Sequence, residues 1–267
     1  MTGQEAQQLS MQDKVVVVTG AAGGIGAALA RVMTSLGARV VISDIDAERA
    51  HAVAVDLGAM LVAGDAASED GVSALVETVQ AEVGPIDVWF ANAGVDLGSG
   101  LESSEEAWAA SWDVNVMAHV RAARLLVPGW AERGEGYFVS TASAAGLLTM
   151  IGAPAYSVSK HGAVAFAEWL AATYRHRGVR VHAICPQGVQ TSMLARAGEL
   201  QGVLGRDRVL TPDEVAQATW EAMQEGRFLV LPHPEVREYY RARAHDTDAW
   251  IGGMNRLQQK VEASRQD

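Results

Sequence analysis

Cysteine and positive charge are both scarce in this 267-residue sequence, and each scarcity excludes a class of protein. The single cysteine, Cys185, rules out an intramolecular disulfide and a cysteine-based metal site. With 21 Lys and Arg residues against 32 Asp and Glu residues, the net charge of −11 argues against binding to nucleic acid or to an anionic membrane surface. The seven histidines show no metal-ligand spacing, so no metal is predicted.

Long apolar runs are also missing. No run approaches the ~18 residues of a transmembrane helix, and residues 1–13 are polar where a signal peptide would carry an apolar stretch. We therefore expect no membrane association and, by default, a cytoplasmic location. Apolar residues nonetheless make up 49% of the chain, which is enough to bury a full core.

Strands and helices are predicted to alternate along most of the chain. Residues 14–19 read KVVVVT, a continuous β-branched run that is typical of a strand buried on both faces. Alternating elements with short connections predict an α/β fold, a single Rossmann-type, doubly wound parallel sheet of about seven strands. The further predicted strands are 39–44, 59–65, 86–91, 136–141, 180–184 and 227–231, and the longest predicted helix is 104–132.

Both ends of the chain and one internal segment depart from this alternation. Apolar residues from Trp250 to Leu257 recur at helical spacing, which predicts a helical extension at the C-terminus. This extension could cover the mouth of an active site or pack on a partner subunit. The predicted divisions are a disordered tail at 1–12, a sheet domain at 13–232 with a flap at about 188–208, and the helical extension at 233–267.

A glycine-rich turn separates the first predicted strand from the first helix. Gly20, Gly24 and Gly26 do not fit the common G-x-G-x-x-G fingerprint, but the strand–turn–helix order places a helix N-terminus where a diphosphate could bind. A purely structural turn would look the same. Asp44 at the end of the second strand favours a nucleotide, because its carboxylate can accept hydrogen bonds from both ribose hydroxyls. The same carboxylate would repel a 2′-phosphate, so we expect NAD rather than NADP.

Tyr156 and Lys160 stand four positions apart in a predicted helix, which places both side chains on one face. A phenol titrates near about 10, but an adjacent ammonium favours the phenolate and lowers its pKa. We therefore expect Tyr156 to exchange protons at physiological pH. Taken alone, the pair could also be a surface lysine beside a half-buried tyrosine.

Together these features resemble the short-chain dehydrogenase/reductase family from Lys14 to Leu231. The order of the motifs along the chain is the specific signal, since each motif is weak by itself. The resemblance implies an NAD-dependent enzyme that interconverts an alcohol and a ketone. A catalytically silent NAD-binding scaffold, or another reaction such as imine reduction, is the alternative. The matching motifs are Thr19 to Gly26, Asn92-Ala93-Gly94, Asn115, Ser143, Tyr156 with Lys160, and Pro186 with Thr191.

The resemblance implies roles for four catalytic residues. Tyr156 would be the general acid/base, Lys160 would lower its pKa and hold the nicotinamide ribose, and Ser143 would donate a hydrogen bond to the substrate oxygen. Asn115 would hold a water molecule that links Lys160 to solvent, although it could also be a buried cap on a neighbouring backbone group. The hydride chemistry itself belongs to the nicotinamide.

The resemblance also implies the residues that would hold NAD. Asp65 ends the third predicted strand, where its carboxylate could meet the adenine amine or could cap the following helix. Thr191 and the backbone at Val189 would bond the nicotinamide carboxamide. The full cofactor set is Gly20, Gly24, Ile25, Gly26, Asp44, Asp65, Ala66, Asn92, Ala93, Gly94, Tyr156, Lys160, Pro186, Gly188, Val189 and Thr191.

Two departures from the family bear on substrate and assembly. Gln187 separates Pro186 from Gly188, where the family usually has Pro-Gly, and would place a polar side chain near the substrate. The helical extension replaces the Gly-rich C-terminus often used in tetramer packing, so a homodimer and a homotetramer are both expected possibilities. The mostly apolar substrate wall favours a hydrophobic secondary alcohol or ketone. Its predicted residues are Ser143, Ala145, Leu148, Tyr156, Gln187 and Met193.

Overall fold

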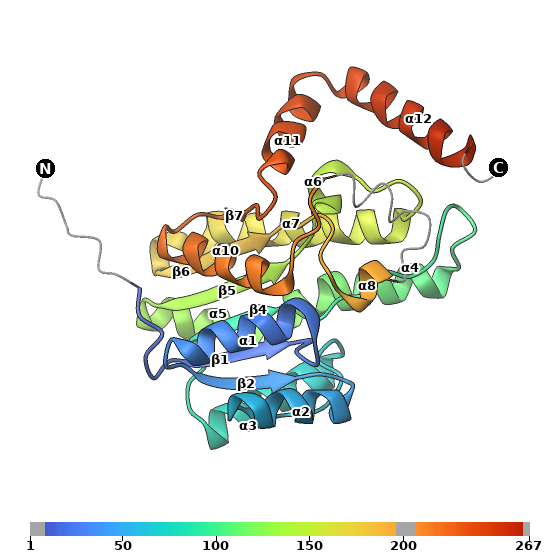
Figure 1. Cartoon of the computed structure of the whole chain (residues 1–267). Coiled ribbons are helices and arrows are strands. Elements are labelled where there is room, and N and C mark those ends of the chain that lie inside the picture. Colours follow the sequence, from blue (N-terminus) through green and yellow to red (C-terminus); the bar gives the residue numbers. More distant parts are fainter. Residues whose placement is uncertain (1–8, 196–206, 264–267) are drawn as a thin grey trace, which may run out of the picture.

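A seven-stranded parallel sheet forms the centre of the molecule. The computed structural model describes residues 9–195 and 207–263, and its strand order is β3-β2-β1-β4-β5-β6-β7 (Figure 1). Every neighbouring pair of strands is parallel. The strands are β1 Val15–Thr19, β2 Arg39–Ser43, β3 Met60–Leu61, β4 Val88–Ala91, β5 Gly136–Thr141, β6 Val179–Ile184 and β7 Leu229–Val230.

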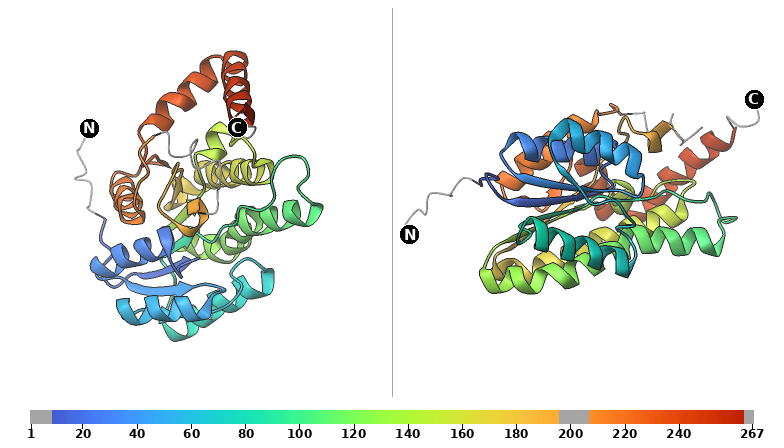
Figure 2. Two further views of the ribbon diagram at one scale, coloured as in Figure 1. Left: turned by 45° about the vertical axis from the view of Figure 1, so that its right-hand side comes forward. Right: turned by 90° about the horizontal axis from the view of Figure 1, so that it is seen from below.

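Helices cover both faces of this sheet, and the right-hand view of Figure 2 shows the sheet between the two layers. One layer contains α1 Gly24–Ser35, α2 Ala47–Leu57 and α10 Pro212–Gln224. The opposite layer contains α3 Glu69–Glu82, α5 Ala118–Arg133 and α7 Pro154–Tyr174, with α4 Glu105–Trp112 leading into α5. Two short helices, α6 Ala145–Leu148 and α8 Ser192–Ala195, lie near the ends of the strands.

The first strand shows why the sequence carries an unbroken apolar run there. Val15 and Val17 pack in the core on the α3 and α5 side, and Val16 and Val18 pack in the core on the α1 side. Side chains along a strand alternate between its two faces, and both faces are buried here. The predicted doubly wound parallel sheet is therefore confirmed.

Some predicted boundaries differ from the structure. The strands predicted at 59–65 and 227–231 are reduced to the two-residue strands β3 and β7, which lie at the two edges of the sheet and pair on one side alone. The helix predicted over 104–132 is interrupted by a π-helical turn at Asp113–Met117. Such turns occur frequently at functional sites, because they redirect the side chains of one helical turn.

The N-terminal boundary also differs from the prediction. Residues 1–8 of the predicted disordered tail lie outside the described residues, as do residues 196–206 of the predicted flap. Met11, which the prediction placed in the tail, is 1% exposed and packs in the core beside Leu29 and Met33 of α1. The backbone N–H of Asp13 donates to the carbonyl of Gly37, so the ordered domain begins before residue 13.

The C-terminal extension consists of two helices, α11 Glu235–His245 and α12 Thr247–Ala263. The chain turns at Asp246, whose carboxylate accepts a hydrogen bond from the backbone N–H of Ala249 in the first turn of α12. Figure 1 shows α11 leading away from β7 and α12 turning back over α6, on the side where the strands end. In the described part of the chain, no helix combines the length and apolar character needed to cross a bilayer.

Candidate active site

A cavity of about 980 Å³ lies at the carboxyl ends of the strands. In an open α/β sheet this edge is the usual position of a ligand site. All but one of the predicted cofactor residues line it, and all of the predicted substrate residues do. The two predicted site residues that do not line the cavity are Gly26 and Asn115, which lie behind its wall.

The glycine turn is needed because three segments of backbone meet there. A Cβ atom on Gly20, which has a φ of +65°, would lie 2.7 Å from Cα of Ala93. A Cβ on Gly26 would lie 2.3 Å from the carbonyl oxygen of Gly20. Asn92 donates hydrogen bonds from Nδ2 to the carbonyls of Thr19 at 3.0 Å and Gly20 at 3.1 Å, and thereby joins the turn to the end of β4.

Asp44 is held in place at the other end of this turn. Its two oxygens accept hydrogen bonds from the backbone N–H groups of Ala22 at 2.8 Å and Asp46 at 3.0 Å, and its side chain lines the cavity. Each carboxylate oxygen retains further acceptor capacity, which is what recognition of ribose hydroxyls requires. The predicted position of Asp44 at the nucleotide end of the cavity agrees with this geometry.

Asp65 also lines the cavity, but it does not cap the following helix. The N-cap of α3 is Ser68, whose hydroxyl accepts from the N–H of Gly71. Asp65 instead accepts a hydrogen bond from the N–H of Ala67 at 2.9 Å, two residues further on. The capping alternative is therefore wrong, and contact with an adenine amine stays a prediction.

Arg49 is a cavity residue that sequence reasoning missed. Its guanidinium lies so close to the glycine turn that a Cβ on Gly23 would be 2.8 Å from one of its terminal nitrogens. Arg49 stands in the first turn of α2, where the Asp46 N-cap accepts from its backbone N–H. A positive charge therefore reaches the nucleotide end of the cavity from a position that the pattern around Asp44 does not indicate.

Three predicted catalytic side chains meet at the inner part of the cavity. Helix α7 places Tyr156 and Lys160 on one face, with Nζ of Lys160 5.6 Å from the centre of the Tyr156 ring. Ser143 follows β5, lines the cavity beside Tyr156 and acts to lower the pKa of its phenol. The Lys160 ammonium also donates to the carbonyl of Thr141 at 2.8 Å, so it is anchored to the end of β5.

Burial dominates the ionisation of this group. It raises the pKa of Tyr156 to about 12, although the nearby Ser143 hydroxyl acts in the opposite direction. It also lowers the pKa of Lys160 to about 8. The expectation that Lys160 makes Tyr156 acidic is therefore wrong for this arrangement of protein groups. Removing a phenol from water disfavours its charged form, and here that cost outweighs the stabilisation by its neighbours.

Asn115 stands in the π-helical turn and is fully buried. Its Nδ2 donates to the carbonyl of Val95 at 2.9 Å and to the hydroxyl of Ser159 at 3.0 Å, while its Oδ1 accepts from the N–H of Val95 at 3.0 Å. The alternative prediction, a buried cap on a neighbouring backbone group, is confirmed. A Cβ on Gly94 would lie 3.1 Å from Oδ1 of Asn115 and 3.2 Å from Nζ of Lys160, so a side chain at this position would be tightly packed against both groups. The water relay stays a prediction.

The substrate side of the cavity is acidic and apolar. Its acidic lining residues are Asp96, Asp207 and Asp246, and of the described residues that line the whole cavity, Arg49 and Lys160 are the basic ones. Burial raises the pKa of Asp96, with Lys160 acting in the opposite direction. Gln187 lines the cavity as predicted, and its buried Oε1 has no hydrogen-bond partner among the described residues.

The C-terminal extension contributes to the same cavity, in agreement with the expectation that it could cover the mouth of the active site. Tyr239 of α11 and Trp250, Met254 and Leu257 of α12 line it together with Ser143 and Tyr156. The helical spacing of the apolar residues in α12 was the available signal. It could not reveal which surface this face would meet.

Comparisons with known proteins agree with this geometry. A sequence model for the family described as short chain dehydrogenase matches residues 14–201. The 1-deoxy-11-beta-hydroxypentalenate dehydrogenase of Streptomyces exfoliatus is 36% identical over 251 residues, which cover 91% of this chain and 90% of that protein.

Solved structures agree as well. A short chain dehydrogenase/reductase from Burkholderia phymatum in complex with NAD has a TM-score of 0.81 at 31% identity, covering 90% of this chain and 96% of the other. L-sorbose reductase from Gluconobacter frateurii, complexed with NADPH and L-sorbose, has a TM-score of 0.76 at 28% identity, covering 84% and 97% of the two chains. The chain therefore belongs to the short-chain dehydrogenase family and is an enzyme of that class of oxidoreductases.

Proposed function

We propose that this protein is an NAD(H)-dependent oxidoreductase that interconverts a hydrophobic secondary alcohol and its ketone. The observation that carries the proposal is that Ser143, Tyr156 and Lys160 line one cavity together with the glycine turn. A proton donor and a second hydroxyl at one point are what reduction of a carbonyl requires from the protein.

The residues present fit a dinucleotide. Backbone N–H groups at the start of α1 are available to a diphosphate, Asp44 faces the ribose position, and Thr191 lies against the turn, 3.1 Å from where a Cβ on Gly24 would be. Lys160 and Tyr156 would hold the second ribose. The bound nicotinamide would supply hydride transfer to and from the carbinol carbon.

The protonation state of Tyr156 determines which step of the reaction this residue can perform. With a pKa of about 12 the phenol carries its proton at neutral pH, and it would give this proton to the carbonyl oxygen as a hydride reaches the carbonyl carbon. Ser143 would hold the same oxygen by a hydrogen bond. In the reverse direction Tyr156 would receive the hydroxyl proton, and the charge on Lys160 would stabilise the phenolate that must first form.

The choice of NAD over NADP rests on Asp44. Its carboxylate would repel a 2′-phosphate, whereas the Arg49 guanidinium beside Gly23 would attract one. Asp44 is fixed by two backbone hydrogen bonds, while Arg49 is the more exposed of the two and lies 3.9 Å from Asp46. We therefore assign NAD, with Arg49 as the residue that would permit some use of NADP.

The charges of the substrate side support an uncharged substrate. Three carboxylates and no basic residue other than Lys160 line that side among the described residues, so phosphate and CoA groups are disfavoured. The relative from Streptomyces exfoliatus is named for a hydroxylated pentalenate. Its name supports a hydroxy compound as the class to test first, whereas the carboxylate in that name is a charge that the acidic lining of this cavity would disfavour.

We also propose that the protein is a homo-oligomer. Trp112 of α4 is 45% exposed and Trp169 of α7 is 55% exposed, although both are large apolar side chains. Aromatic side chains of this size are favoured at protein interfaces. Sedimentation of the purified protein would distinguish a dimer from a tetramer.

The experiment that tests the proposed activity is a screen of the purified protein against alcohols and ketones with each nicotinamide cofactor, followed by nicotinamide absorbance. We expect turnover of secondary alcohols with NAD and of their ketones with NADH. A protein that binds NADH but turns over none of these compounds would support a scaffold role. Turnover restricted to imines would assign a different reaction to the same site.

A further inference from the structure

Helix α12 presents an apolar stripe to the catalytic cavity. Trp250, Met254 and Leu257 line the cavity and are partly buried, and Val261 at the end of the same stripe is 8% exposed. Ile251, which the sequence pattern grouped with them, lies on the outer side and is 58% exposed. Helix α12 is therefore amphipathic, with its apolar face toward the site that contains Tyr156.

Helix α11 holds α12 in this position through contacts with three parts of the active-site wall. Val236 is fully buried in the core, and the Tyr239 hydroxyl donates to the carboxylate of Asp207 at 3.3 Å. Arg243 donates to the carbonyl of Leu147 and contacts Nε2 of His161 at 3.0 Å. Since His161 follows Lys160 directly, α11 is joined to the catalytic helix itself.

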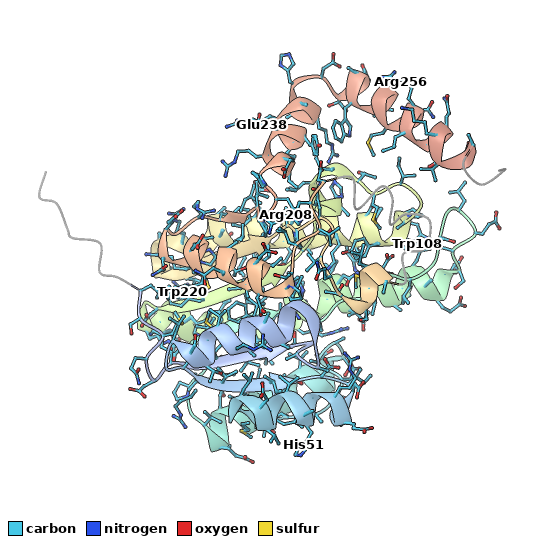
Figure 3. The ribbon with its side chains drawn as sticks, viewed as in Figure 1. His51, Trp108, Arg208, Trp220, Glu238 and Arg256 are labelled. Carbon is cyan, nitrogen blue, oxygen red and sulfur yellow. The ribbon has the colours of Figure 1, made fainter. Side chains whose placement is uncertain are left out.

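A buried histidine joins the start of the extension to the predicted substrate residue Gln187. Nδ1 of His233 accepts a hydrogen bond from the N–H of Gln187 at 3.1 Å, and its Nε2 donates to the carbonyl of Arg208 at 3.1 Å. His233 is 1% exposed, and Figure 3 shows Arg208 below the start of α11. The start of the C-terminal extension at His233 is thus fixed against the loop after β6.

We propose that α12 is the outer wall of a substrate compartment that takes a bulky, uncharged, multi-ring secondary alcohol or its ketone. This inference rests on the proposed function and names the substrate class for that site. The compartment is apolar on three sides, with Leu148 and Ile151 from the α6 region, Met193 from α8, and Trp250, Met254 and Leu257 from α12. A wall with few polar groups recognises a substrate by its shape and apolar area.

The cavity must hold the dinucleotide as well as the substrate. Its volume of about 980 Å³ is at the upper end of the ~300–1,000 Å³ that ligand sites usually occupy. Because the cavity is continuous from the glycine turn to α12, a cofactor at one end leaves the α12 end for the substrate. The acidic residues Asp96, Asp207 and Asp246 disfavour an anionic ring compound there.

Two adjacent glycines in α12 provide a matched test. Gly253 lines the cavity and Gly252 does not. A Cβ on Gly253 would have an Arg256 nitrogen at 3.8 Å as its nearest neighbour, and one on Gly252 would have an Arg256 nitrogen at 3.6 Å, so both positions accept a side chain. Replacing glycine in a helix interior also favours the helix in both variants. Gly253→Phe would fill the compartment, and Gly252→Phe is the control.

The wild type and both variants would be assayed with cyclohexanol, 2-decalol and a 3-hydroxysteroid. In the wild type we expect kcat/KM to rise with ring number. Gly253→Phe should lower kcat/KM for the steroid by ~10-fold or more, since a filled pocket rejects substrates by size. The same variant should keep kcat/KM for cyclohexanol within ~3-fold of the wild-type value. Gly252→Phe should leave both values within ~2-fold of the wild type, because its side chain lies outside the cavity.

Binding of the steroid to the NADH complex, measured by calorimetry, separates failure of this inference from failure of the proposed function. Steroid binding that Gly253→Phe removes and Gly252→Phe retains supports the compartment even if no alcohol is turned over. Turnover of cyclohexanol alone, or equal behaviour of the two variants, overturns the inference and leaves the proposed function standing. A change in oligomeric state in Gly253→Phe alone would instead assign the α12 face to a second copy of the chain.

Discussion

The Lys160 ammonium donates a hydrogen bond to the carbonyl oxygen of Thr141 at 2.8 Å while it lies 5.6 Å from the centre of the Tyr156 ring. The lysine is therefore held by the end of β5 rather than by the phenol. This arrangement makes Tyr156 a protonated donor at neutral pH and makes Lys160, of these two groups, the one whose charge changes closer to physiological pH.

Replacing Tyr156 with Phe should remove the proton donor and leave the rest of the site in place. We expect turnover to fall by ~10²–10⁴-fold, which is the usual contribution of general acid catalysis. NADH binding, followed by fluorescence titration, should change little. Tyr174→Phe at the far end of the same helix is the control and should retain activity. Wild-type rates in Tyr156→Phe would contradict the acid/base assignment.

The pH dependence of ketone reduction should follow the protonation of Lys160. Burial lowers its pKa to about 8, so its charge is lost as the pH rises through this value, whereas Tyr156 keeps its proton until a pH of about 12. We therefore expect kcat/KM for reduction to decrease above about pH 8. Alcohol oxidation requires the phenolate, which the charged Lys160 stabilises, so its rate should increase with pH up to about 8 and level off above it.

Lys160→Arg provides the control for this profile. A guanidinium stays charged throughout, so the variant should be slower but should lose the decrease near pH 8. An unchanged profile in Lys160→Arg would assign the titration to a group other than Lys160.

Lys160 should also make the free energy of unfolding depend on pH. Its folded pKa of about 8 lies below the unfolded value of 10.5, so the unfolded chain binds more protons between these two values. The free energy of unfolding should therefore increase as the pH rises through this window. Below the window Lys160 is protonated in both states, so it causes no change with pH there. Urea unfolding of the wild type and of Lys160→Met across the window would isolate this contribution.

Replacing Asp44 and replacing Arg49 should shift the preference between NAD and NADP in opposite directions. Asp44→Ala removes the carboxylate that repels a 2′-phosphate, so kcat/KM with NADP relative to NAD should rise by ~10-fold or more, a change of about 1.4 kcal/mol. Arg49→Ala should lower the use of NADP and leave the use of NAD largely unchanged. Arg31→Ala, which removes an exposed charge paired with Asp213 outside the cavity, is the control.

The position of Met11 in the core predicts a stability effect close to the N-terminus. Met11 is 1% exposed, and truncation of a buried methionine to alanine usually costs about 2–5 kcal/mol. We expect Met11→Ala to lower the free energy of unfolding by an amount in this range, measured with urea. Gln12→Ala, at an exposed neighbouring position, should have little effect. Equal stability of the two variants would restore residue 13 as the start of the domain.

Several features of this protein follow from local sequence alone. The β-branched run in β1 predicts a strand buried on both faces, and glycine is required at position 26 because the carbonyl oxygen of Gly20 occupies the space of a side chain. The spacing of Tyr156 and Lys160 places them on one helical face wherever the helix packs. These properties depend on residues that are close in sequence, so the sequence is sufficient to predict them.

Other features were decided by contacts between residues far apart in the chain. The high pKa of Tyr156 results from its burial, which no spacing rule measures, and Arg49 reaches Gly23 because α2 packs beside the first turn. The apolar face of α12 could be identified from the sequence, but which surface it meets is determined by the anchoring of α11 to Asp207, Leu147 and His161. Desolvation and long-range packing depend on the folded chain as a whole. These two effects determine the protonation states and the shape of the site.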